Sequence, residues 1–234
     1  MIEIYFIRHG QASFGQPDYD CLSSLGQEQA RLLGRYFHNT GTRFDKIYCG
    51  SLKRHRQTAT IALNQMNGDR PLTMAIDPDF NEFDSSDLLM NRLCRVIQAD
   101  PTLADQMRHI HNQHGAIARI FEIAEKRGLV PTDEATRLNL AMQFSDRILR
   151  AITNLVHTVG DQGKTAVFTS GGPTAVALHQ ALATSREQTI RLGRELRNTA
   201  VTVLRHDQGE LNLVRFNCVA HLEAQNHANL ITYI

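Results

Sequence analysis

Apolar runs mark three segments of the chain. Residues 2–7 are mostly β-branched and aromatic, and this run ends abruptly at Arg8-His9-Gly10. Similar runs occupy residues 44–49 and 164–169, and the last of them leads into Ser170-Gly171-Gly172. A short unbroken apolar run is typical of a strand buried in a parallel sheet. We therefore predict three buried strands, two of which end in glycine-containing loops.

Helical spacing follows each of these strands. Between residues 24 and 41 apolar side chains recur three or four positions apart, which predicts an amphipathic helix. Ser24 is a suitable N-cap for this helix, and Gly41 is a suitable place for it to stop. A second helix is predicted from about Leu52. A third is predicted after the second glycine loop, where Pro173 suits the first turn.

The order of these elements predicts the fold class. Residues 200–204 and 211–216 are apolar or alternating segments on either side of a polar turn, which indicates a late pair of strands. Alternating strands and helices predict an α/β fold, a three-layer sandwich in which helices flank a mostly parallel central sheet. Residues 85–139 show helical patterns without a convincing strand. We interpret this range as a helical insertion or lid within a single domain of residues 1–234.

Composition narrows the choice of partners and compartment. Lys plus Arg number 25 against 24 for Asp plus Glu, so no overall basic field is available to bind a nucleic acid. The first apolar run is too short for a signal peptide, and no later run approaches membrane-spanning length. The four cysteines are widely scattered, which fits a reducing compartment. We expect a cytoplasmic protein without nucleic-acid or membrane partners.

Two arginines and a histidine suggest phosphate chemistry. A neutral imidazole such as that of His9 is a good nucleophile toward phosphorus, and Arg8 offers paired donors to phosphate oxygens. Taken alone, the tripeptide is more simply interpreted as a loop histidine beside a surface arginine. A phosphoryl group carries about two charges, so a second arginine from another strand-to-helix junction is expected. Arg54 fits that position, although it can also be a solvated helix residue beside Lys53 and Arg56.

Several motifs occur in a specific order. They are Arg8-His9-Gly10-Gln11, residues 22–30, residues 51–59, Phe80-Asn81-Glu82 and Thr169-Ser170-Gly171-Gly172. In this order they resemble the histidine phosphatase superfamily, the phosphoglycerate mutase-like group. The resemblance covers about residues 1–83 and 144–234 and leaves the insertion unmatched. Arg-His-Gly-Gln-Ala-Ser and Thr-Ser-Gly-Gly-Pro are similar to motifs of a bacterial branch of that family.

The resemblance implies roles for four residues. His9 is the histidine that becomes phosphorylated, and Arg8 and Arg54 bind the phosphoryl oxygens. Glu82 is the carboxylic acid that protonates the leaving oxygen, with Asp84 and Asp87 as rival acids. The arginines and the glycine loop supply the electrostatic stabilisation, so neither a metal nor a cofactor is expected.

The fourth motif departs from the family pattern. Members usually have a second histidine where this chain has Ser170, and that histidine binds the phosphoryl oxygens in the transition state. Ser170 can donate one hydrogen bond, and the amides of Gly171 and Gly172 at a helix N-terminus can hold an anion. Loss of one such donor typically lowers the rate by about 100- to 1,000-fold. The change therefore predicts slower catalysis that is still measurable.

Together these patterns predict a histidine acid phosphatase-type enzyme that hydrolyses a small phosphorylated substrate. Alternatives are a phosphoglycerate mutase-type phosphotransferase, or a phospholigand-binding protein whose catalysis is weakened by Ser170. The spacing of His109, His111 and His114 argues against a zinc site. His221 is interpreted as a structural residue. The sequence leaves the substrate and the oligomeric state open.

Overall fold

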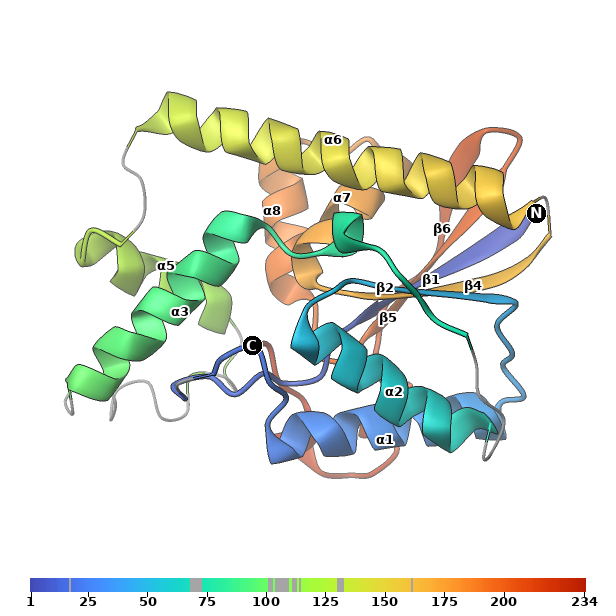
Figure 1. Cartoon of the computed structure of the whole chain (residues 1–234), viewed down its shortest axis with the longest axis horizontal. Coiled ribbons are helices and arrows are strands. Elements are labelled where there is room, and N and C mark those ends of the chain that lie inside the picture. The colour runs from blue at the N-terminus through green and yellow to red at the C-terminus, as the bar shows by residue number, and fades with distance from the viewer. Residues whose placement is uncertain are drawn as a thin grey trace.

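The computed structural model describes residues 1–16, 18–67, 73–100, 103, 110, 113, 115–129, 133–160 and 162–234. These residues form a six-stranded sheet with helices packed on both of its faces (Figure 1). In the order of the chain, the strands and α-helices are β1 (Ile2–Arg8), α1 (Ser24–Asn39), β2 (Lys46–Cys49), α2 (Lys53–Asn67), β3 (Ala75–Ile76), α3 (Asp84–Ala99), α5 (Ala116–Lys126), α6 (Glu134–Val159), β4 (Gly163–Thr169), α7 (Gly171–Leu182), α8 (Arg186–Glu195), β5 (Val201–Asp207), β6 (Glu210–Cys218) and α9 (Ala220–Glu223).

The sheet is mostly parallel, as predicted. The strands lie in the order β3-β2-β4-β1-β5-β6, and the pairs β1/β4, β2/β4 and β2/β3 are parallel. The last two strands run antiparallel, β5 to β1 and β6 to β5. Within the β1/β4 pair, Arg8 lies opposite Thr169. The loops that follow these two strands therefore leave the sheet at the same edge.

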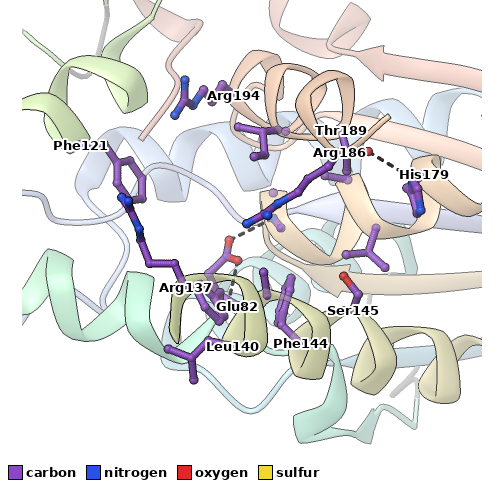
Figure 2. Close-up of a pocket in the computed structure, with 18 of the residues that line it drawn as sticks. Glu82, Phe121, Arg137, Leu140, Phe144, Ser145, His179, Arg186, Thr189 and Arg194 are labelled. Atoms are coloured by element: carbon purple, nitrogen blue, oxygen red, sulfur yellow. Dashed lines mark hydrogen bonds between the residues drawn. The ribbon is translucent and has the colours of Figure 1, made fainter. Parts of the chain in front are cut away.

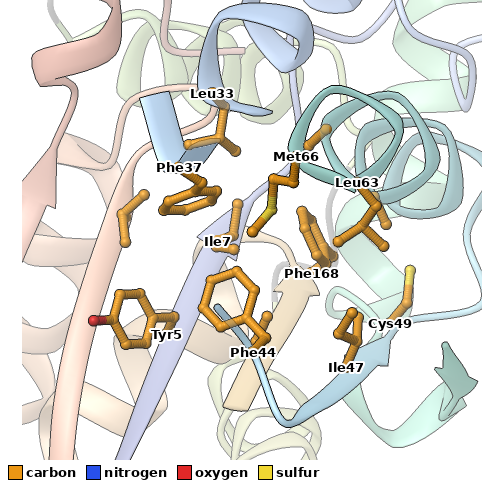
Figure 3. Close-up of a cluster of buried hydrophobic side chains, with 14 of the residues drawn as sticks. Tyr5, Ile7, Leu33, Phe37, Phe44, Ile47, Cys49, Leu63, Met66 and Phe168 are labelled. Atoms are coloured by element: carbon orange, nitrogen blue, oxygen red, sulfur yellow. The ribbon is translucent and has the colours of Figure 1, made fainter. Parts of the chain in front are cut away.

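Alternate side chains of β1 enter two separate cores. Tyr5 and Ile7 pack against α1 and α2 on one face, where they meet Leu33, Phe37 and the ends of neighbouring strands (Figure 3). On the other face, the even-numbered residues of β1 pack against α6 and α7. This period of two is the geometry of a strand that is buried on both faces, and it explains the unbroken apolar run at residues 2–7.

A third core connects the helices of the 85–139 range to the rest of the chain. Leu93 and Ile97 of α3 and Ile120 of α5 pack with Tyr19 from the loop after β1 and with Ile234. In Figure 1, α3 and α5 lie beyond the edge at which the parallel strands end. Among the described helices, none is both long enough and apolar enough to cross a membrane.

Several boundaries differ from the prediction. Ser23, not Ser24, caps α1, because its hydroxyl accepts a hydrogen bond from the Gly26 amide at 3.0 Å. Helix α6 starts inside the predicted insertion and continues to Val159, so the predicted boundary at residue 139 falls within a helix. The sequence analysis also missed α8 and the two-residue strand β3, which is too short for any period to be visible.

Helices α1 and α2 approach closely at Gly34. A Cβ atom added to Gly34 would lie 2.2 Å from the carbonyl oxygen of Ala62, a backbone atom that cannot turn aside. Alanine normally stabilises a helix by about 1 kcal/mol relative to glycine. Here the overlap reverses that preference, because the two helices must separate to admit a methyl group.

We therefore expect Gly34→Ala to decrease the free energy of unfolding by about 1–3 kcal/mol. Urea unfolding followed by circular dichroism measures this change. Arg35→Ala, on the exposed side of the same helix, is the matched control and should shift stability by less than about 0.5 kcal/mol. A Gly34→Ala protein as stable as the native one would contradict the close approach.

Candidate active site

His9 is buried in the loop after β1, and its backbone is held on both sides. Its amide donates to the carbonyl of Thr169 at 2.9 Å, and its own carbonyl accepts from the amide of Thr199 at 3.1 Å. The ring Nδ1 lies 2.7 Å from the carbonyl oxygen of Gly10. A carbonyl oxygen can only accept, so Nδ1 carries the proton and Nε2 keeps its lone pair. The loop thus fixes the tautomer in which Nε2 can act as a nucleophile.

The surroundings of His9 also keep its ring neutral. Burial lowers the pKa of His9 well below its usual 6.5, and the neighbouring Arg54, Arg8 and His55 lower it further. Only the neutral imidazole is nucleophilic. The two arginines therefore help to keep His9 in the form that can act as a nucleophile.

Arg8 is held in place by main-chain oxygen atoms. Its Nη1 donates to the carbonyl of Leu196, and its Nη2 donates to the carbonyl of Tyr233 at 2.9 Å. Nε is buried and has no hydrogen-bond partner among the described residues. Burial lowers the pKa of Arg8 to about 10, against the opposing effect of Tyr19 and Glu82, so the side chain remains a cation at pH 7. A fixed guanidinium with a spare donor is suited to binding an anion.

Arg54 enters the site from the start of α2 and is also buried. Its Nη1 donates to Asp20 at 2.7 Å, and its guanidinium lies over the ring of Tyr19, 5.4 Å from the centroid. The second oxygen of Asp20 accepts from the amide of Lys53 at 2.8 Å and so caps α2. The sequence analysis missed Asp20, because no sequence pattern shows that a carboxylate in an irregular loop will contact Arg54 in the folded chain.

Glu82 contacts the glycine loop directly. One carboxylate oxygen accepts from the amide of Phe83 at 2.8 Å, and the other accepts from the amide of Gly172 at 3.1 Å (Figure 2). Arg186 extends from α8 toward Glu82 in the same view. The side chains of the rival acids, Asp84 and Asp87, lie outside the described part of the structure.

Ser170 occupies the N-cap position of α7, but its side chain makes no capping hydrogen bond and faces inward. Its side chain is fully buried, and its Oγ lies 2.6 Å from Nε2 of His55. Gly171 and Gly172 line the cavity described below, whereas Ser170 is not among its lining residues. Phosphate binding by Ser170 and Gly171 therefore stays a prediction. The sequence analysis assigned no role to His55, although a histidine directly after Arg54 was a visible signal.

Apart from Ser170, the residues assigned to chemistry line one cavity of about 740 Å³. Arg8, His9, Arg54 and Glu82 all contribute to its wall. Much of the remaining wall is apolar. It includes Phe83, Phe121, Leu140, Phe144, Leu149 and Ile190. Figure 2 shows Phe121, Leu140 and Phe144. The cavity combines a charged region with an extended apolar wall.

His221 supports the site from behind. Its Nε2 lies 2.8 Å from the hydroxyl of Thr199, the residue whose amide holds the carbonyl of His9. His221 does not line the cavity, so a structural role fits its position. His109, His111 and His114 lie outside the described residues.

Comparison with known proteins identifies the family. The family model of the histidine phosphatase superfamily (branch 1) matches residues 4–219. The chain belongs to this superfamily. A broad-specificity phosphatase of Saccharomyces cerevisiae is 37% identical over 70 residues, which are 27% of this chain and 30% of that protein. The chain therefore matches less than a third of the length of this relative.

Solved structures share the whole fold. Phosphoserine phosphatase from Entamoeba histolytica, in complex with phosphoserine, is 17% identical with a TM-score of 0.60, and the match covers 95% of this chain and 100% of that one. Phosphoglycerate mutase from Bacillus anthracis is 15% identical with a TM-score of 0.63, and the match covers 97% of each chain. These similarities confirm the predicted phosphoglycerate mutase-like fold.

The buried histidines predict how stability depends on pH. Burial lowers the pKa values of His9, His55 and His221, the last to about 3. Below pH 6.5 the unfolded chain binds protons at these positions that the native protein does not. Stability is therefore complete above that pH and is lost as the pH falls, by about 1.4 kcal/mol per pH unit for each such proton.

Urea unfolding at pH 7 and pH 5 measures this loss. His221→Gln should reduce this loss of stability by the share of one proton. His227→Gln, at an exposed position, is the control and should leave the loss unchanged. If His221→Gln loses as much stability as the native protein between the two pH values, the assignment of a neutral buried His221 is wrong.

Proposed function

We propose that this protein hydrolyses phosphomonoesters through a covalent phosphohistidine on His9, without a metal ion. The observation that carries the proposal is the neutral, buried ring of His9, whose Nε2 keeps its lone pair in a cavity shared with Arg8, Arg54 and Glu82. A nucleophile, two cations and an acid are what transfer of a phosphoryl group to an imidazole requires.

In the first step, Nε2 of His9 attacks phosphorus and the bond to the ester oxygen breaks. Glu82 gives its proton to that oxygen, so the alcohol leaves neutral. Arg8 and Arg54 hold the other phosphoryl oxygens. Their fixed partners, two carbonyls for Arg8 and Asp20 for Arg54, reduce the reorganisation needed when the substrate arrives.

In the second step, water attacks the phosphohistidine and the nitrogen–phosphorus bond breaks. Glu82, now ionised, takes a proton from the water, and inorganic phosphate and neutral His9 are released. The amide of Gly172, which donates to Glu82 at 3.1 Å, holds the carboxylate in place between the two steps.

The apolar wall supports a substrate whose alcohol part is apolar. Phe121 of α5, Leu140 and Phe144 of α6 and Ile190 of α8 line the same cavity as His9. We further propose that the 85–139 range acts as a lid, since its described residues Met90, Phe121 and Leu129 contribute to that wall. Burying an apolar group there is worth about 25 cal/mol for each Å² removed from water.

Hydrolysis of para-nitrophenyl phosphate tests the reaction. We expect the native protein to release phosphate equally well with and without a chelator, His9→Ala to lose at least about 1,000-fold in kcat, and Glu82→Gln to lose about 100- to 10,000-fold. Acid-quenched native protein should contain an acid-labile phosphoryl group that His9→Ala lacks.

The controls separate this reaction from its alternatives. His38→Ala, on α1 away from the cavity, should retain native activity. Full activity in His9→Ala, or its abolition by a chelator, would overturn the proposal. Transfer of the phosphoryl group to a second substrate instead of water would favour the mutase alternative.

Substrate preference tests the apolar wall. We expect naphthyl or long-chain alkyl phosphates to have a KM at least about tenfold lower than glycerol phosphate, because they bury more apolar surface. Phe121→Gln should remove most of this difference and leave hydrolysis of glycerol phosphate unchanged. Val214→Gln, at an exposed apolar position on β6, is the matched control. Equal KM values in the native protein would exclude the apolar substrate class.

A further inference from the structure

A buried histidine lies beside the serine that replaces the second histidine of the family. His55 is fully buried at the start of α2, and its Nε2 is 2.6 Å from the Oγ of Ser170. Its ring centroid lies 5.7 Å from that of His9, and the two ring planes are inclined by 31°. The chain therefore keeps two neighbouring imidazoles, although the second one comes from a different strand-to-helix junction.

The backbone around His55 leaves space for its ring. A Cβ atom added to Gly50 would lie 2.3 Å from Nδ1 of His55, so only glycine is compatible with the ring in this position. Ser170 is fully buried against the same ring. Because Oγ of Ser170 already lies 2.6 Å from the ring, we infer that a larger side chain extending in the same direction would overlap with His55, so that the two positions share one volume.

We propose that His55 and Ser170 together perform the role of the second histidine. Neither side chain lines the cavity as it stands, because the hydroxyl of Ser170 is turned toward His55. In this proposal the hydroxyl turns to donate to a phosphoryl oxygen, and His55 is the positioning residue behind it. This inference rests on the phosphohistidine reaction proposed above. It assigns a function to Ser170, whereas the sequence alone indicates only that the second histidine is missing.

The hydrogen bond between the two side chains can adopt two states. Without a ligand, the hydroxyl of Ser170 can donate to the lone pair of Nε2. When a phosphoryl oxygen accepts that hydroxyl hydrogen instead, Nε2 of His55 must carry a proton and donate to Oγ. His55 supplies that proton by changing tautomer or by taking one up.

The charges around His55 favour its neutral form until a phosphoryl group is bound. Arg54 is adjacent on α2, and the ring of His9 faces that of His55 from the loop after β1. Arg54 and Arg8 also act on His9. Burial and Arg54 together lower the pKa of His55. A bound phosphoryl group adds negative charge, which offsets these cations and favours protonation of the ring. Positive charge thus becomes available when the intermediate forms.

Moving the histidine back to position 170 tests the proposal. We expect His55→Ala to lower kcat for an aryl phosphate by about 100-fold with KM changed less than about threefold. Ser170→His alone should also lose activity, because its ring would overlap with His55. The double variant His55→Ala with Ser170→His should recover at least about tenfold over His55→Ala, since one imidazole then occupies the shared volume.

A second pair of variants covers the case in which a histidine substitution fails to fold. Ser170→Ala should lower kcat about as much as His55→Ala, and combining the two should cost no more than either alone, as for residues that act as a unit. Arg56→Ala, at the exposed next position of α2, is the matched control and should keep native kcat. Thermal melting monitored by circular dichroism checks that each variant is folded.

Native kcat in His55→Ala, or a double variant no more active than His55→Ala, would overturn the pairing. Either result leaves the phosphohistidine reaction intact, provided that His9→Ala is inactive. If the native protein releases no phosphate, the proposed reaction is wrong, and the pairing of His55 with Ser170 is then tested by the dissociation constant for inorganic phosphate. His55→Ala should weaken phosphate binding, and the double variant should restore it. If His55→Ala binds phosphate as tightly as the native protein, the pairing is wrong as well.

Discussion

Parallel pairing of β1 with β4 is the constraint on which the site depends. It places Arg8 opposite Thr169, so the loops that follow the two strands leave the sheet side by side. Backbone hydrogen bonds extend the pairing past the strands, because the amide of His9 donates to Thr169 and that of Gly50 donates to Phe168. The loop from β2 to α2 is therefore held at the same edge as the other two. Three strand-to-helix junctions converge there, and each contributes a polar side chain.

Burial of these polar groups then determines their chemistry. Arg8 and Arg54 are held by two carbonyls and by Asp20, which offsets part of the cost of removing two cations from water. The same burial keeps His9 and His55 neutral. Exposure to solvent would remove the main cause of their lowered pKa values. In the reaction proposed above, the low dielectric would serve both phosphate binding and the reactivity of His9.

Secondary contacts connect the three junctions into one unit. The hydroxyl of Thr58 accepts from the amide of Gly10 at 3.0 Å and donates to the carbonyl of Arg54 at 2.7 Å, so the loop after β1 is bound to α2. Glu82 is joined to the start of α7 through the amide of Gly172. Residues of α3, α5, α6 and α8 form the apolar wall. The charged part of the cavity is thus held by hydrogen bonds to the main chain and to Asp20, while the apolar wall comes from a different set of helices.

The sequence by itself determined five of the six strands, the fold class and the motif residues His9, Arg54 and Glu82, because apolar periodicity and short motifs are local features of the chain. It did not locate the boundary of α6, the partner Asp20 or the contact between His55 and Ser170. Those depend on which distant loops meet at one edge of the sheet, and that is decided only when long-range strand pairing and packing bring them together. From the sequence, a serine in place of the second histidine indicates that a phosphate-binding group is missing. The folded chain places another histidine, His55, beside that serine.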